Sequence, residues 1–249
     1  MPRAKPTVEQ DSQEPAEQAA RNSAAKPARE VASPPRKSLY GLLQYSFYRS
    51  VRNVSSIVAV FVFGLRCIGR EHTHVPGGAL VLSTHQSHFD PVLIGVTFNE
   101  RLNYLAKRSL FKSRLFGGLI SLLNAIELDR DRSGLAGLKE TLRRLKRGEK
   151  VLIFPEGTRS ADGDIAPLKP GFLSVARRSK VPLIPIAITG AYEALPRGNR
   201  WPLRYPLRVA VGPVITAEQV AELDDEAVLA LITRRLHECH RQAQASRIS

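Results

Sequence analysis

A histidine and an aspartate stand five positions apart in the polar stretch HQSHFD, His85 to Asp90. A histidine held by a carboxylate is a common general base at neutral pH, because the acid fixes the tautomer and stabilises the imidazolium. The apolar run Ala79 to Leu82 predicts a strand that ends just before this stretch. Asp90-Pro91 is typical of a helix start, with Asp90 as the N-cap. The two side chains are therefore expected to meet across a loop between a strand and a helix.

A second stretch shows the same pattern of a strand followed by a polar loop. VLIFPEGTRS, Val151 to Ser160, again places a strand-like run before a polar loop. Ligands of open α/β sheets bind outside the strand ends, where such loops converge. Taken alone, the His-x4-Asp spacing also fits a loop residue and a helix cap with no chemical role. Two such loops at one sheet edge favour a functional site.

Strand-like and helix-like segments alternate through the rest of the chain. This pattern predicts an α/β fold with a mostly parallel or mixed central sheet flanked by helices. The expected strands are 66–70, 79–83, 103–107, 125–129, 151–154, 183–189 and 207–211. The expected helices are one capped by Ser133 and closed by Gly148, one over 170–179, and a C-terminal one that starts at a capping box, Thr216 to Gln219.

The composition indicates what kind of partner the protein binds and which redox compartment it occupies. The chain has 249 residues, a formal net charge of +14 and two cysteines, Cys67 and Cys239. Such a charge favours an anionic partner, whether nucleic acid, a membrane surface or a phosphorylated substrate. Two isolated cysteines indicate a reducing compartment without disulfides. Residues 1–37 hold few large apolar side chains and are expected to be a disordered tail, and residues 68–249 are expected to form the main domain.

Residues 38–67 differ sharply from both neighbours, since they mix Leu, Val, Phe and Tyr with three arginines. The uninterrupted apolar run, Ile57 to Leu65, is about half the ~20 residues that a spanning helix needs. Interleaved aromatic residues and arginines predict one or two helices that lie in a membrane interface. The alternative is a pair of ordinary core helices.

Two other classes of protein remain as alternatives. A metal hydrolase would use His85, His88 and Asp90 as ligands, but the sequence lacks further ligands at suitable spacing, and the same holds for His237 and His240. We therefore expect no metal. A non-enzymatic basic protein would bind nucleic acid or membrane, but it would need neither the His-Asp pair nor the FPEGTR block. We expect no nucleic-acid partner.

Residues 67–213 resemble the 1-acylglycerol-3-phosphate acyltransferase family, the glycerolipid acyltransferases with a His-x4-Asp signature. Four blocks stand in the family's order: HQSHFD, AIELDR at Ala125 to Arg130, FPEGTRS at Phe154 to Ser160, and VPLIPI at Val181 to Ile186. LAKRSLF around Lys107 and LKPGF around Lys169 add support. Thr84 stands where the family often has asparagine.

The resemblance implies acyl transfer from acyl-CoA or acyl carrier protein to the sn-2 hydroxyl of 1-acylglycerol 3-phosphate, which gives phosphatidate without an acyl-enzyme or a cofactor. Another lysophospholipid or a lyso-amino-lipid is the alternative acceptor. His85 would be the base and Asp90 its orienting partner. The acceptor would be bound by residues of the other blocks: Lys107, Arg130, Glu156, Gly157, Thr158, Arg159 and Lys169. Glu156 would order the loop or bind a glycerol hydroxyl. The protein would be a peripheral or monotopic enzyme on the cytoplasmic face of the cell membrane.

Overall fold

The computed structural model describes residues 39–107, 125–128, 135–196, 199 and 201–248. Tyr40–Ser249 forms one compact unit. The expected tail, residues 1–37, lies outside the described residues, as do Ser133 and Arg130.

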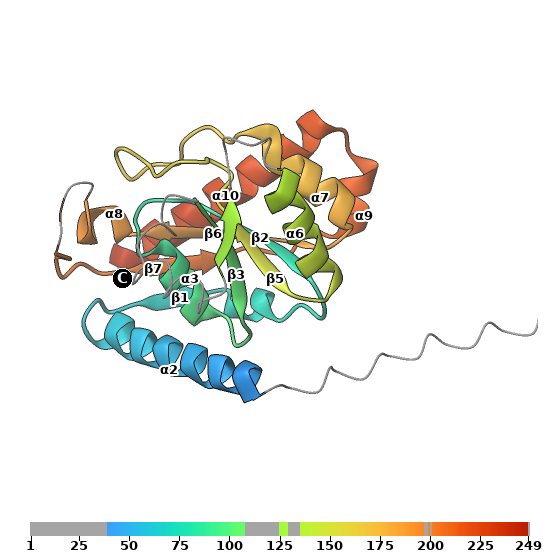
Figure 1. Ribbon diagram of the computed structural model, residues 1–249. Helices are drawn as coiled ribbons and strands as arrows, with labels where there is room; N and C mark the ends of the chain where they lie inside the picture. The colour runs from blue at the N-terminus through green and yellow to red at the C-terminus, as the bar shows by residue number, and fades with distance from the viewer. Residues whose placement is uncertain (1–38, 108–124, 129–134, 197–198, 200, 249) are drawn as a thin grey trace, which may run out of the picture. The chain divides into compact units, whose positions relative to one another are not determined.

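The core of this unit is one seven-stranded sheet with the order β1-β7-β6-β2-β5-β3-β4 (Figure 1). Every neighbouring pair is parallel except β6 and β7, so β1 and β7 run opposite to the other five strands. This confirms the predicted mixed sheet. The strands are β1 (Arg66–Ile68), β2 (Ala79–Ser83), β3 (Leu102–Lys107), β4 (Ala125–Leu128), β5 (Lys150–Ile153), β6 (Leu183–Thr189) and β7 (Arg208–Val211).

Strand β2 is buried along its whole length because both of its faces are covered. Ala79 and Val81 belong to one apolar cluster, together with Leu93 of helix α3 (Asp90–Thr97). Leu80 and Leu82 point to the opposite side and belong to a second cluster. A strand that contributes alternate side chains to two cores has to be apolar at every position, which explains its continuous run.

The remaining helices form the outer layers. Ala59 of α2 lies in the same cluster as α3, whereas α6, α7, α9 and α10 contribute to the cluster on the other side of the sheet. Their bounds are α2 (Leu39–Phe61), α6 (Leu135–Lys146), α7 (Leu173–Ser179), α8 (Ala191–Ala194), α9 (Ala217–Glu222) and α10 (Asp225–Ile248), with short 3-10 helices at Arg70–Thr73 and Pro170–Phe172.

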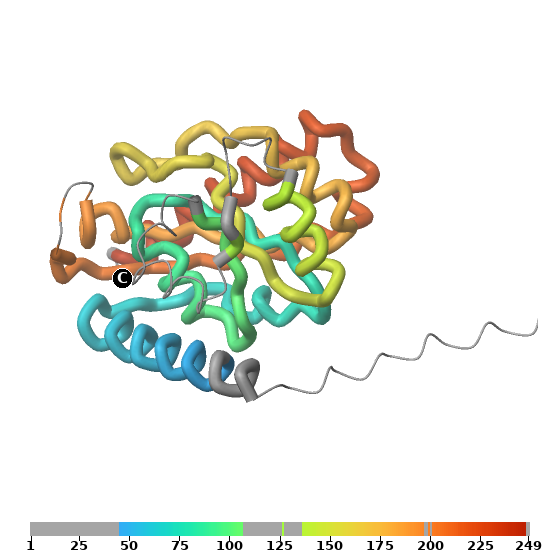
Figure 2. The backbone as a smooth tube through the Cα atoms, in the orientation of Figure 1, coloured from blue at the N-terminus to red at the C-terminus, as the bar shows by residue number. Residues whose placement is uncertain are grey.

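One helix prediction needs correction. The C-terminal segment is not one helix. The capping box of Thr216 and Gln219 forms as expected, but α9 ends at Glu222, and Asp224 then accepts a hydrogen bond from the Ala227 amide (2.8 Å) that starts α10. Residues 39–61 form a single helix, α2, and Figure 2 traces the chain from it through a turn into β1. The expected boundary at Ile68 thus falls inside a strand of the sheet.

The strand directions bring three connections to one edge of the sheet. Arg66, Arg208 and Thr189 share a register position, so β1 and β7 begin where β6 ends. The carboxyl end of β2 lies at the same edge, because β2 and β6 are parallel. The turn that follows α2, the loop that follows β2 and the connection from β6 to β7 therefore all lie at what we call the carboxyl edge.

Candidate active site

His85 and Asp90 meet across the loop that follows β2. The Nδ1 atom of His85 lies 2.8 Å from Oδ2 of Asp90. The Asp90 side chain is fully buried, whereas that of His85 is 19% exposed. The other ring nitrogen, Nε2, has no hydrogen-bonding partner among the described residues. The ring is thus held on one side and open on the other.

Asp90 is not the N-cap that the sequence suggested. Phe89 takes that position, with a helical backbone, and Asp90 is the first residue of α3. Its Oδ2 atom instead accepts hydrogen bonds from the amides of Gln86 (2.6 Å) and Ser87 (2.8 Å). The carboxylate satisfies the loop before the helix because the chain folds back over it. The sequence predicted Asp90 as a helix cap, but its side chain instead stabilises the histidine loop.

The surroundings of Asp90 act on its charge in opposite directions. Burial raises the pKa of Asp90, and this is the largest effect. The His85 ring and the two loop amides favour the ionised form and lower the pKa. An ionised Asp90 accepts the Nδ1 proton of His85, which leaves the lone pair of that ring on Nε2.

Glu156 ties the second loop to the first. Its Oε1 accepts from the backbone amide of His85 (2.8 Å), and its Oε2 accepts from that of Ala166 (3.0 Å). The Ser160 amide donates to the His85 carbonyl at 2.7 Å. Glu156 is almost completely buried, which raises its pKa. With both oxygens engaged on backbone amides, this side chain orders the loops.

Phe154 supports the ring of His85. The two rings are stacked, with centroids 3.9 Å apart and planes 15° from parallel. Phe154 directly follows β5, and the register of β5 with β2 places it beside the start of the histidine loop. Sequence analysis missed this contact, although the paired strand ends could have indicated it.

Thr84 and Gln86 also hold the histidine loop. The Oγ1 atom of Thr84 accepts from the Ile188 amide at 3.0 Å, and its amide donates to the Ile186 carbonyl at 3.2 Å. The residue that departs from the expected asparagine therefore ties the loop to β6. Gln86 is buried and donates through Nε2 to the Gly163 carbonyl.

The FPEGTR loop places a lysine beside a glycine. Gly157 has a φ of +69°, in the left-handed region that favours glycine. A Cβ atom on it would lie 3.1 Å from Cδ and 3.3 Å from Nζ of Lys169. The Lys169 amide donates to the Pro155 carbonyl at 2.8 Å, which fixes this lysine next to the loop. Lys169, one of the expected acceptor ligands, thus lies over Gly157.

Arg159 is half-buried and close to His88, an exposed residue of the histidine loop. Burial lowers the pKa of His88, and the positive charge of Arg159 lowers it further. Thr158 is exposed in the same loop. A guanidinium and a hydroxyl at the rim of the histidine loop are suited to binding an anion.

Two of the expected ligands cannot be placed. Arg130 lies outside the described residues. Lys107 is the last residue of β3, and its backbone reaches the same edge as the end of β5, but its side chain is outside the described part.

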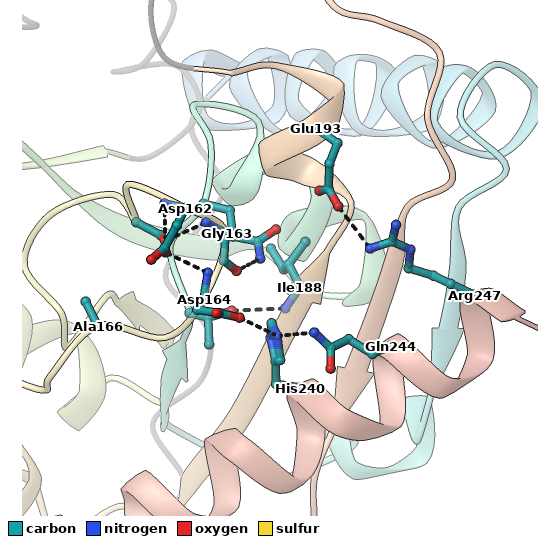
Figure 3. A network of polar contacts seen from close by, with 12 residues as sticks. Asp162, Gly163, Asp164, Ala166, Ile188, Glu193, His240, Gln244 and Arg247 are labelled. Carbon is teal, nitrogen blue, oxygen red and sulfur yellow. Dashed lines mark hydrogen bonds and ion pairs between the residues drawn. The ribbon is translucent and has the colours of Figure 1, made fainter.

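A polar network connects the second loop to helix α10 (Figure 3). Ser160 Oγ accepts from the Gly163 amide at 2.9 Å, and Asp164 lies 3.9 Å from Nε2 of His240. His240 is buried and contacts Gln244 at 2.9 Å. Among the described residues, no three His, Cys, Asp or Glu side chains gather where they could hold a metal ion. His240 thus belongs to this loop network.

Comparison with known proteins identifies the family. The model of the Acyltransferase family matches residues 64–189, which is half of the chain and includes both loops. The chain belongs to the acyltransferase family. The 1-acyl-sn-glycerol-3-phosphate acyltransferase of Pseudomonas aeruginosa is 33% identical over 182 residues, 67% of each chain. The enzyme of the same name from Bacillus subtilis is 27% identical over 192 residues, 77% of this chain and 94% of that protein.

A solved member of the acyltransferase family has the same fold. The crystal structure of the 1-acyl-sn-glycerophosphate acyltransferase PlsC from Thermotoga maritima matches with a TM-score of 0.66 and 24% sequence identity. The match covers 80% of this chain and 82% of that one. The sheet and its flanking helices are therefore those of a known acyltransferase.

Proposed function

We propose that this acyltransferase moves a fatty acyl group from a thioester donor to the sn-2 hydroxyl of 1-acylglycerol 3-phosphate, which yields phosphatidate. The observation that carries the proposal is the His85–Asp90 contact of 2.8 Å at the carboxyl edge, with Nε2 of His85 unpartnered among the described residues. The choice of acceptor is supported by two relatives that are named 1-acyl-sn-glycerol-3-phosphate acyltransferase. The match to the Bacillus subtilis protein covers 94% of that protein.

His85 acts as a general base in this proposal. Its Nε2 takes the proton of the acceptor hydroxyl while the oxygen attacks the thioester carbonyl carbon. The tetrahedral intermediate then expels the thiolate, and the imidazolium returns the proton to it. Asp90 positions the ring and stabilises the imidazolium. The reaction needs no acyl-enzyme and no cofactor, and the thioester donor is acyl-CoA or acyl carrier protein.

The acceptor phosphate binds at the rim of the FPEGTR loop. Arg159 provides a bidentate donor pair, and Thr158 a hydroxyl. Gly157 allows the phosphate to approach the backbone, and the nearby Lys169 adds a positive charge. Lys107 and Arg130 remain candidate ligands from their sequence blocks. We assign Glu156 to the support of this rim, because both of its oxygens bind backbone amides.

Helix α2 is the proposed membrane contact. Tyr48 and Ala59 face inward, and the Tyr48 hydroxyl accepts from the Leu102 amide at 3.2 Å. The opposite stripe, at helical spacing, is apolar yet exposed: Val54, Ile57, Val58 and Phe61. No helix in the described part of the chain has the length and apolar character needed to cross a bilayer. An apolar stripe of this kind suits a helix that lies in the interface, here on the cytoplasmic face of the membrane.

Arginines on and beside the N-terminal half of α2 match the headgroup region. The guanidinium carbon of Arg101 lies 4.9 Å from the centre of the Tyr45 ring, and that of Arg49 lies 5.8 Å from it. Arg52 donates to the Val96 carbonyl at 3.3 Å. These cations, held by aromatic rings and the backbone, are suited to lipid phosphates.

The test is acyl transfer by purified protein to vesicle-borne acceptors. Labelled oleoyl-CoA and oleoyl acyl carrier protein are each offered with lysophosphatidate, glycerol 3-phosphate or a zwitterionic lysophospholipid. We expect transfer to lysophosphatidate, with loss of activity in His85→Ala and a weaker acceptor affinity in Arg159→Ala. Arg234→Ala on the exposed surface of α10 is the matched control for loss of an arginine. Preference for a zwitterionic acceptor would refute the assigned substrate, and no transfer from either donor would refute the reaction.

A further inference from the structure

An exposed apolar tip lies in the connection between β6 and β7. Trp201 is 82% exposed and Leu203 is 56% exposed, and Pro202 and Arg204 beside them are exposed too. Water contact at large apolar side chains is unfavourable, by roughly 1.5 to 3 kcal/mol for each side chain of this size class. Adjacent exposed Trp and Leu side chains thus indicate a partner surface.

The backbone of this tip is held in place at Leu203 and just after it. The Leu203 amide donates to the Ala194 carbonyl at 2.7 Å. Tyr205 packs against the core cluster, and the guanidinium carbon of Arg247 lies 4.8 Å from its ring centre. The chain is therefore held at Leu203 and Tyr205, next to the exposed Trp201 side chain.

The tip shares its edge of the sheet with the membrane helix and the histidine loop. The Leu207 amide donates to the Phe63 carbonyl at 3.1 Å, in the turn that follows α2. Phe61, the last residue of α2, and Val62, the first residue of the turn, are exposed. Figure 1 shows this connection and the C-terminal end of α2 at the same end of the domain. The exposed apolar residues of the tip and those at the end of α2 therefore both lie at the carboxyl edge, which also carries His85.

Charge decides what kind of surface the tip meets. Between Pro196 and Pro206 the sequence has three arginines and no acidic residue, and the chain carries +14 overall. Tryptophan is the side chain most typical of the membrane interface, where its ring sits at headgroup level. Arginine beside it matches the phosphates of anionic lipids. A protein partner would need no such charge around its apolar contact.

We infer that Trp201 and Leu203 form a second membrane anchor, which inserts into the interface of an anionic bilayer beside the end of α2. Two contacts flanking the carboxyl edge fix the tilt of the domain, so that the histidine loop faces the lipid surface. The inference extends the proposed docking of α2. It rests on separate residues, and its test reads lipid contact and not acyl transfer.

The protein carries its own reporter, because Trp201 is its single tryptophan. Emission of the full-length protein is recorded with vesicles of phosphatidylcholine, with and without phosphatidylglycerol. We expect a shift to shorter wavelength with anionic vesicles. Lipids brominated near the glycerol end of the acyl chain should quench it more than lipids brominated near the methyl end. This result would hold whether or not lysophosphatidate is the acceptor.

Variants separate the tip from α2 in vesicle co-sedimentation. Trp201→Ser with Leu203→Ser should weaken binding at least tenfold, because both apolar side chains that would leave water are removed. Trp201→Phe should largely keep it. Arg204→Ala should weaken binding to anionic vesicles about fivefold, whereas Arg234→Ala, its exposed control on α10, should not.

Three results would overturn the inference. The first is Trp201 emission that stays that of exposed indole while the protein sediments with vesicles. The second is emission already shifted without lipid and dependent on protein concentration, which would assign the tip to a second copy of the chain. The third is failure of the full-length protein to bind anionic vesicles, which would remove the docking role of α2 as well.

Discussion

Replacing Asp90 with asparagine isolates the electrostatic part of the proposed base. The change keeps the shape of the side chain and removes its charge. In the transition state the His85 ring becomes positive beside the carboxylate, whose Oδ2 is 2.8 Å from Nδ1. Two unit charges about 4 Å apart attract by about 4 kcal/mol at an effective dielectric constant of about 20. A neutral amide oxygen can still accept the Nδ1 proton, so part of this stabilisation remains.

The expected loss is therefore a fall in kcat of roughly 10²- to 10³-fold. The KM for lysophosphatidate should stay nearly constant, because Asp90 is buried behind the histidine and cannot reach the acceptor. The assay is the initial rate of acyl transfer from labelled oleoyl-CoA at saturating acceptor. Circular dichroism and vesicle binding verify the fold and the docking of each variant.

A matched control comes from a second histidine–aspartate contact in the part of the chain that the structure describes. Asp164 lies 3.9 Å from His240 and is largely exposed, so Asp164→Asn should leave kcat within about twofold, as for surface changes generally. His85→Ala combined with Asp90→Asn should be no slower than His85→Ala alone, because residues that act as a unit are not additive. A kcat within tenfold of the natural protein, or additive losses in the double variant, would refute the assigned roles.

Three further variants test the second loop. Arg159→Ala should raise the KM for lysophosphatidate by more than tenfold, since hydrogen bonds between charged groups contribute about 1.5 to 3 kcal/mol; an unchanged KM in steady-state kinetics would exclude it as the phosphate ligand. Gly157→Ala should lower the free energy of unfolding by about 1 to 2 kcal/mol, because its φ of +69° suits glycine. It should also weaken acceptor binding by displacing Lys169. Gly148→Ala, at a φ of +81°, is the control and should affect stability alone. Glu156→Gln tests the raised pKa of that buried carboxyl. The natural protein should lose stability as the pH rises from the ordinary pKa of 4.5 through the raised pKa, because the unfolded chain releases this proton at a lower pH than the folded chain does. The variant should lack this loss. Urea unfolding from pH 4 to 8 measures the difference, and identical pH profiles for the two proteins would contradict it.

The sequence predicted the sheet well because its strands are strongly patterned. All seven expected strands are present, most of them within one or two residues of the expected bounds. The break between α9 and α10 was not predicted, since the apolar spacing continues across it and only Leu223 and Asp224 separate the two helices. Local pattern identifies an element more reliably than it locates the end of that element.

The site was predictable in its residues but not in their contacts. The His85–Asp90 pair follows from a short spacing within one loop. The bonds of Glu156 to His85 and Ala166 depend on how two loops from different strands pack, as does the stack of Phe154 on His85. Such contacts are set by tertiary structure, which a strand and turn pattern does not encode.

The pairing of β1 with β7 also constrains how the chain can fold during synthesis. Cys67 pairs with Val209, about 140 residues later. At roughly 5 to 20 residues per second, about 7 to 30 seconds separate the synthesis of the two strands. During that interval β1 has no partner strand, and the only completed element before it in the described chain is α2, with its apolar stripe exposed. Because β7 is the last strand of the sheet in the chain, the β1 edge, which follows α2, is the last edge of the sheet that can close.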